Sequence, residues 1–263
     1  MSLASYLSLP KISRRAWQVW RRDWDVFMKT WKVNFLPPAV EPVLYLLALG
    51  FGLGMFVTEI EGRPYAEFIA PALIAITIMN SSFFECTYAS FVRMYYQKTF
   101  DAIVATPLNV DEVIAGELLW GATRSTISAT IMLAIVSLFG LASYPLSLII
   151  IPFSFLGGLM FASIAMCFTA VTPRIDSLNY PTSLFITPMF LVSGTFFPLS
   201  MLPAAVQTFA YAAVPLVHVV TVTRNLTYGW LEGDTVLSLL WILAVTALFF
   251  LLSVNMMKRR LIV

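Results

Sequence analysis

The sequence predicts an all-α integral membrane protein with six transmembrane helices, on three observations. Hydrophobic residues make up 59% of the 263-residue chain and charged residues only 11%, which is too apolar for a soluble domain. Six apolar stretches are long enough to cross a bilayer, at residues 37–58, 69–92, 117–141, 146–172, 178–198 and 236–257. If the chain starts on the cytoplasmic side, all but two of its 16 Lys and Arg residues fall on that side, the exceptions being Arg63 and Arg224. Because short cytoplasmic loops are enriched in Lys and Arg, we expect both termini to face the cytoplasm.

The rest of the sequence bounds the domain organisation. No segment outside the six stretches is long enough for a separate soluble domain, so residues 1–263 are expected to form one transmembrane domain. The basic residues lie beside the predicted spans rather than in a module of their own, which argues against nucleic-acid binding. Cys86 and Cys167 both fall inside predicted spans, so we expect neither a disulfide nor a metal cluster. The first 35 residues contain no continuous apolar core, so no cleavable signal peptide is expected.

Residues 11–33 predict an amphipathic helix that lies along the membrane surface. Its aromatic and apolar side chains recur every three or four residues and share one face: Trp17, Trp20, Trp24, Phe27, Met28 and Trp31. Basic side chains flank this face and suit anionic lipid headgroups. The helix is either a surface anchor alone or an anchor that also contacts a cytosolic partner.

The second predicted span carries a carboxylate, Glu85, in the cytoplasmic half of the bilayer, with Asn80 nearby. An unpaired carboxylate at that depth is costly, so Glu85 either pairs with Arg93 or Arg124 or faces a water-filled cavity. Both interpretations stay open at this point. Glu41, in the first turn of the first span, is explained by the helix dipole, which favours an anion there.

The segment between the second and third spans, residues 93–116, predicts a short amphipathic helix at the cytoplasmic mouth. Its apolar side chains share one face: Phe100, Ile103 and Val104. Thr106 precedes Pro107 and ends this helix, because a residue before proline disfavours the helical conformation. Asn109 followed by Glu112 predicts a capping box that restarts a helix into the third span. Such a helix could dock on a soluble motor, although a plain interfacial helix would give the same pattern.

The stretch after the fifth predicted span, residues 199–217, is apolar but is interrupted by Pro203 and Pro215. We expect a pair of short helices that enter the outer leaflet while buried against protein. His218 follows and is the only histidine of the chain. It is expected to be a hydrogen-bonded structural residue rather than a ligand or a proton relay.

Sequence motifs for catalysis do not occur in this chain. No glycine is followed by lysine, so the phosphate-binding loop G-x-x-x-x-G-K-[ST] is missing and ATP cannot be hydrolysed by that route. A single histidine excludes the H-E-x-x-H zinc motif, and no G-x-S-x-G motif occurs. Ionisable groups inside the spans are also fewer than an ion-driven carrier usually needs. We therefore expect no catalytic residue and no metal site, and we expect energy to come from another chain.

Several of these features recur together in one family. They are the surface helix, the short helix ending in Thr106-Pro107-Leu108, the Ser193–Pro198 segment, and Pro215-Leu216-Val217-His218. Their order resembles the membrane subunit of type-2 ABC exporters over essentially the whole chain. Three further stretches are similar to its nodulation-factor lipo-oligosaccharide permease branch (NodJ-type): 49–54, 87–94 running into 99–102, and 116–120.

The resemblance implies a homodimer bound to two copies of a separate ABC ATPase, which would hold ATP and Mg, with no cofactor in this chain. Residues 94–106 would be the coupling helix that enters the ATPase, 11–33 the connecting helix, and 199–217 the outer re-entrant helices. The positions implied as ATPase contacts are Gln97, Lys98, Thr99, Phe100, Asp101, Thr106 and Pro107. Candidate positions along the translocation path are Asn80, Glu85, Phe196 and Phe197.

The sequence therefore predicts a permease subunit, not an enzyme, of an ATP-driven exporter in a bacterial cytoplasmic (inner) membrane. Its expected cargo is an amphiphile such as a lipo-oligosaccharide, a glycolipid or a lipid-linked glycan, and membrane lipid is a further partner. The alternatives are a multidrug or small-amphiphile ABC exporter permease, a self-sufficient carrier and a passive lipid scramblase.

Overall fold

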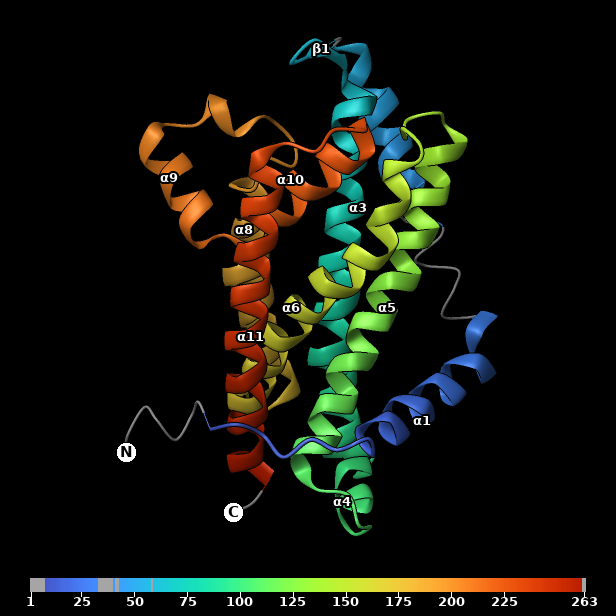
Figure 1. Ribbon diagram of the computed structural model, residues 1–263, viewed down its shortest axis with the longest axis vertical. Helices are drawn as coiled ribbons and strands as arrows, with labels where there is room; N and C mark the ends of the chain where they lie inside the picture. Colours follow the sequence, from blue (N-terminus) through green and yellow to red (C-terminus); the bar gives the residue numbers. More distant parts are fainter. Residues whose placement is uncertain (1–7, 33–39, 41–42, 58, 262–263) are drawn as a thin grey trace.

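The computed structural model describes residues 8–32, 40, 43–57 and 59–261. Within these ranges the chain is mainly helical, and its only strands are the two-residue pair β1 (Glu59–Ile60) and β2 (Arg63–Pro64) (Figure 1). Four helices are long and apolar enough to cross a membrane: Tyr65–Tyr96, Val110–Leu138, Leu146–Val171 and Gly233–Leu261. The chain is thus a multi-pass, all-α membrane protein.

These four helices overlap four of the six predicted spans: 69–92, 117–141, 146–172 and 236–257. The first consists of α3 (Tyr65–Phe84), η4 (Glu85–Ala89) and η5 (Val92–Tyr96), the last two being short π-helical turns. The second is α5 (Val110–Leu138), which begins seven residues earlier than predicted. The others are η6 (Leu146–Ile149) with α6 (Ile150–Val171), and α11 (Gly233–Leu261).

The two remaining predicted spans differ from the long helices. Parts of 37–58 lie outside the described residues, and the described part is a shorter apolar helix, Val43–Met55, which includes η2 (Leu46–Gly52) and η3 (Leu53–Met55). In place of 178–198 there is a helical run that ends at Leu191: η7 (Ile175–Leu178), α7 (Asn179–Pro181), η8 (Thr182–Ile186) and α8 (Thr187–Leu191). The run ends early because the chain turns at Gly194, whose φ of +73° favours glycine.

The segment predicted as re-entrant, 199–217, contains η9 (Leu199–Met201), α9 (Ala204–Ala213) and the start of α10 (Pro215–Tyr228). The axes of α9 and α10 differ by 89°. Pro215 explains the bend, because it disfavours a helical conformation at the residue before it. His218 stacks on Trp241 with ring centroids 4.1 Å apart, and its nitrogens lie 3.2 Å from Ser238 Oγ and 3.0 Å from the Tyr211 carbonyl oxygen. The predicted hydrogen bonding of His218 is confirmed.

The helices α3, α5 and α6 pack against one another, and α11 packs on α6 (Figure 1). The approach of α5 and α6 is close because Gly158 faces Ser125. A Cβ atom added at Gly158 would lie 2.5 Å from Ser125 Cβ. Small residues at such crossings are how membrane helices gain contact, since lipid offers no hydrophobic driving force for their association.

One end of the bundle carries α1 (Ala16–Lys29), α4 (Thr99–Val104) and the first and last described residues, Ser8 and Leu261, and the β1–β2 pair lies at the other (Figure 1). The predicted helix 11–33 is shorter than expected, because residues 11–15 are not helical. The residues that α1 buries overlap the predicted aromatic face only at Phe27; the others are Ala16, Val19 and Asp23. The indoles instead form a stacked row beside these buried residues, with Trp17 54% exposed and its ring centroid 4.0 Å from that of Trp20.

Candidate functional site

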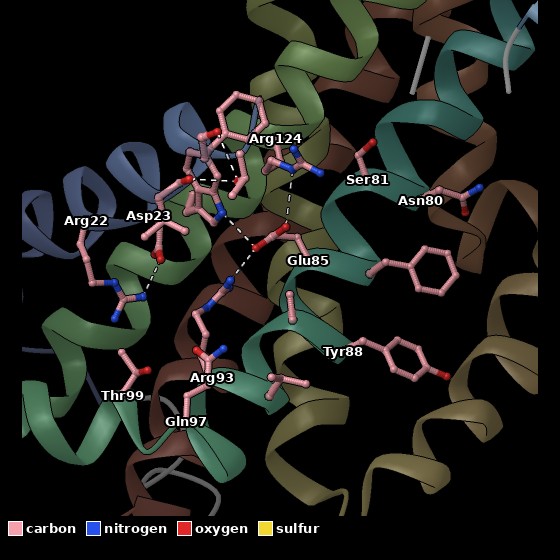
Figure 2. Close-up of a pocket in the computed structure, with 17 residues that line it drawn as sticks. Arg22, Asp23, Asn80, Ser81, Glu85, Tyr88, Arg93, Gln97, Thr99 and Arg124 are labelled. Atoms are coloured by element: carbon pink, nitrogen blue, oxygen red, sulfur yellow. Dashed lines mark hydrogen bonds and ion pairs between the residues drawn. The ribbon is translucent and has the colours of Figure 1, made fainter. Parts of the chain in front are cut away.

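A cavity of about 810 Å³ opens between α1, the α3–η5 helix and α5 (Figure 2). One part of its wall is aromatic and comes from three elements: Phe27, Phe84, Tyr88 and Trp120. Another part is charged and comes from the same elements: Arg22, Asp23, Glu85, Arg93 and Arg124. A cavity with both kinds of wall fits a molecule that has a polar and an apolar part.

Arg93 joins two carboxylates at the charged side of this cavity. Its Nη1 lies 2.8 Å from Glu85 Oε1, and its Nη2 lies 2.6 Å from Glu117 Oε2. Glu117 is fully buried and also accepts a hydrogen bond of 2.7 Å from the Ser90 hydroxyl. The Trp120 indole donates to Glu85 Oε1 at 2.9 Å. Both carboxylates are therefore held by donors from the protein itself, as buried charges require.

Two further arginines complete the charged side. Arg124 Nε lies 3.5 Å from Glu85 Oε2, and the Arg124 guanidinium sits 5.0 Å from the centre of the Phe27 ring. Arg22 Nη2 contacts Asp23 Oδ1 at 2.5 Å and Glu117 Oε1 at 3.2 Å. The network thus links α1 to both long helices, with three cations and three carboxylates in contact.

Helical spacing explains why these side chains converge. Glu117, Trp120 and Arg124 are separated by three and four residues, so they share one face of α5. Ser81 and Glu85 share a face of the neighbouring helix for the same reason (Figure 2). Burial raises the pKa of Asp23, on the surface helix α1, from 3.8 to about 7, and the Glu117 carboxylate adds to this while Arg93 and Arg22 oppose it.

The structure brings some of the predicted path residues together and leaves others apart. Glu85 satisfies both interpretations, since it pairs with Arg93 and Arg124 and also lines the cavity. Asn80 lines the same cavity. Phe196 and Phe197 do not line it; the Phe196 carbonyl oxygen instead accepts a hydrogen bond from Tyr65, at the far end of α3. Sequence reasoning missed Glu117, whose spacing to Trp120 and Arg124 was the available signal.

The predicted coupling segment 94–106 is not one helix but the end of η5 followed by α4, because Lys98 separates the two with a left-handed φ of +53°. Among its candidate contact residues, the exposed ones are Gln97, Lys98, Asp101, Thr106 and Pro107, and Thr99 is half-buried. Phe100 is 0% exposed, so in this conformation it anchors α4 to the bundle and offers no surface to a partner. Gln97 and Thr99 also line the cavity, which places the start of α4 at its edge.

Residues 8–15, called the strap below, cross the same end of the bundle and hydrogen-bond the residues that follow α4. Arg15 donates from Nη1 to the Pro107 carbonyl oxygen at 2.6 Å, and the Lys11 N–H donates to Asp111 Oδ2 at 2.9 Å. Ser13 hydrogen-bonds Glu112, a member of the predicted capping box. That capping box is confirmed, since both of its Asn109–Glu112 bonds measure 2.9 Å.

The strap also reaches α11. The Ser8 hydroxyl donates to Asn255 Oδ1 at 2.7 Å, and Lys258 Nζ lies 3.0 Å from Asp111. The strap therefore connects the start of α5, the end of α11 and the residues that follow α4.

In the part of the chain that the structure describes, no group of three His, Cys, Asp or Glu side chains is placed to hold a metal ion.

Comparison with known proteins gives relatives over most of the chain. A family model described as "ABC-2 type transporter" matches residues 14–228. The chain is 34% identical over 244 residues to "Nodulation protein J" of Sinorhizobium fredii, covering 93% of each chain. It is 32% identical over 262 residues to "Nodulation protein J" of Rhizobium leguminosarum bv. trifolii, covering 100% of each. It is 22% identical over 210 residues to "Inner membrane transport permease YadH" of Escherichia coli, covering 75% of each. No solved structure matches the chain.

Proposed function

Because the chain belongs to the ABC-2 type transporter family, as its membrane-spanning permease, we propose that it forms the translocation path of an exporter driven by a separate ABC ATPase. The cargo is an amphiphile of the lipo-oligosaccharide, glycolipid or lipid-linked glycan class. Two findings support this class: the relatives named nodulation protein J, and a cavity with an aromatic wall beside a charged one. The name of a more distant relative supports an inner-membrane location.

The observation that carries the proposal is the continuity between α4 and the cavity. α4 is exposed at Asp101 and anchored at Phe100, so a partner pressing on it would move it as a rigid unit. Thr99 begins α4 and Gln97 follows the end of η5; both line the cavity, and Arg93 lies four residues before Gln97 within η5. Displacement of α4 would therefore be transmitted directly to the charged side of the cavity.

The proposed cycle follows from this connection. ATP-driven closure of the partner pushes α4, moves η5 with Arg93, and changes the shape of the cavity. Cargo must bind the two conformations with different affinity, since otherwise ATP energy cannot give the transport a direction. Two copies of the chain and two ATPases complete the assembly, with six spans in each copy. The end that carries α1, α4 and both termini faces the cytoplasm, in keeping with its many basic residues.

The test is export by the complex of this chain with its ATPase, reconstituted in liposomes. Asp101→Arg reverses an exposed charge on α4, and Asp176→Arg reverses an exposed charge on η7 as the matched control. We expect Asp101→Arg to reduce both glycolipid export and ATP turnover, and Asp176→Arg to leave both near the wild-type rates. Wild-type export and ATP turnover in Asp101→Arg would contradict docking through α4.

Liposomes that contain the chain without the ATPase test whether it works as a self-sufficient carrier or as a scramblase. Glycolipid movement at the full rate in these liposomes would favour one of those two functions over an ATP-driven exporter. Export of a small drug-like amphiphile by the complete complex, with no export of a glycolipid, would favour a multidrug exporter.

A further inference from the structure

We propose that the cavity between α1, α3 and α5 binds the anionic group of an amphiphile's headgroup, such as a phosphate or sulfate ester, with Arg124 as the principal contact. This inference rests on the proposed function, since it names the chemical class of cargo or lipid that the cavity accepts. The inference is supported by polar side chains that line the cavity and have donors or acceptors not used in hydrogen bonds within the protein.

Arg124 carries a guanidinium with five N–H donors, most of which are unused. Within the described residues its polar contacts amount to the single 3.5 Å approach to Glu85, which is longer than a charge-assisted hydrogen bond. Arg93 and Trp120 hold the other oxygen of Glu85, Oε1, at 2.8 Å and 2.9 Å, so the Glu85 carboxylate keeps two close donors when Arg124 binds a ligand. Among the three arginines of the network, Arg124 can therefore bind a ligand with the smallest loss of existing hydrogen bonds.

Arg22 offers a second unused donor on the other side of the cavity. Its Nη2 holds Asp23 and Glu117, whereas its Nη1 is buried and has no hydrogen-bond partner in the described part of the chain. A buried N–H without a partner is costly, so a ligand oxygen or water is needed there. Arg22 and Arg124 come from different helices, and both residues line this one cavity.

Neutral polar groups with spare capacity line the cavity as well. The side chains of Asn80 and Ser81 form no hydrogen bond to any described residue, although both lie within a membrane-spanning helix. Ser81 lies on the same side of that helix as Glu85 (Figure 2). Polar groups in a span are expensive unless they face water or a ligand. These two suit the ester or sugar oxygens that flank an anionic group.

The charge of the cavity favours an anion over a cation. Three arginines line it, against the carboxylates of Asp23 and Glu85, while Glu117 is fully buried behind them and occupied by protein donors. Asp23, with its raised pKa, can take up a proton when an anion enters, which keeps the group of charges balanced. The aromatic wall beside Arg124, formed by Phe27 and Trp120, accommodates the start of an apolar chain.

The test uses the full chain in phosphatidylcholine nanodiscs, without an ATPase, and measures binding of dodecyl phosphate and of dodecyl maltoside by native mass spectrometry. We expect dodecyl phosphate to bind about tenfold or more tightly than dodecyl maltoside, because charge-assisted hydrogen bonds contribute to the first alone. Arg124→Gln should remove this preference, and Arg124→Lys, which keeps the charge, should restore part of it. Arg174→Gln, which changes an exposed arginine just before η7, is the matched control and should bind as the wild type does.

In the detergent measurement, three outcomes would overturn the inference: equal affinity of the wild type for the two detergents, an unchanged preference in Arg124→Gln, or the same loss in Arg174→Gln. Inorganic phosphate distinguishes the source of the anion. If it binds as tightly as dodecyl phosphate, the site holds a free anion and the amphiphile assignment fails. Export is measured separately with the ATPase: selective binding without ATP-driven export overturns the proposed function alone, and export without selective binding overturns this inference alone.

Discussion

Arg93 and Glu117 form a buried ion pair in which both Nε and Nη2 of the arginine donate to the same carboxylate oxygen, at 3.0 Å and 2.6 Å. Glu117 belongs to α5 and Arg93 to η5, so the pair joins two membrane-spanning helices. The carboxylate is 0% exposed, whereas the arginine also reaches Glu85 at the edge of the cavity. One guanidinium therefore connects a structural carboxylate to one that lines the candidate site.

Replacing Glu117 by Gln should destabilise the protein by about 3–5 kcal/mol, the usual result of removing one member of a buried ion pair. Thermal unfolding in detergent would show this as a lower midpoint. The matched control is Glu67→Gln, since Glu67 pairs with Arg63 at 3.3 Å in a far more exposed position. For Glu67→Gln the loss of unfolding free energy should stay below about 1 kcal/mol. Equal shifts for the two variants would mean that the Arg93–Glu117 pair contributes no more than a surface pair.

Gly158→Ala should destabilise the bundle by about 1–3 kcal/mol, the usual cost of overpacking. The added Cβ would lie 2.5 Å from Ser125 Cβ, and neither helix can move without disturbing its neighbours. Gly233→Ala is the control, because nothing lies within 4 Å of a Cβ added there. In a double-mutant cycle with Ser125→Gly, the two substitutions should interact by at least about 0.5 kcal/mol, and additive effects would contradict the close approach.

Much of the fold could be predicted because the signals are local. Apolar runs of sufficient length mark four of the helices, and Asn109 with Glu112 marks the start of α5. The two cations that pair with Glu85 were also among the predicted alternatives, since Arg93 and Arg124 are the nearest cations by predicted depth. Each of these inferences needs only chain length, hydropathy or a short spacing.

The rest depended on packing that periodicity does not reveal. On α1 the indoles of Trp20 and Trp24 only border the contact with α5, and Val19 lies at its closest point, because only a small side chain fits against Gly116 of α5. A Cβ added at Gly116 would lie 2.5 Å from Val19 Cβ. Similarly, the apolar face of α4 gave no sign of whether Phe100 meets the bundle or a partner, and it meets the bundle. Glu117 was missed because its partner Arg93 lies 24 residues away in sequence.

Asp111→Ala should release the strap formed by residues 8–15. Asp111 Oδ2 accepts the Lys11 N–H and also contacts Lys258, so the substitution removes one bond between the strap and α5 together with an ion pair between α5 and α11. We expect faster hydrogen–deuterium exchange over residues 8–15, with little change in α3 or α6. Asp101→Ala, at an exposed position on α4, should leave exchange of the strap as in the wild type. Unchanged protection in Asp111→Ala would show that other bonds suffice to hold the strap.

Asp23 should make stability depend on pH. Burial raises its folded-state pKa from 3.8 to about 7, an effect increased by Glu117 of α5 and opposed by Arg93 of η5 and Arg22 of α1. Between about pH 4 and pH 7 the folded protein therefore binds more protons than the unfolded chain, so the free energy of unfolding falls as pH rises through this window and levels off above it. Asp23→Asn removes this contribution, whereas Asp25→Asn, on the exposed side of the same helix, retains it. Between about pH 5 and about pH 8, the thermal unfolding midpoint should therefore fall further in the wild type and in Asp25→Asn than in Asp23→Asn. Identical pH dependence in all three proteins would exclude a raised pKa at Asp23.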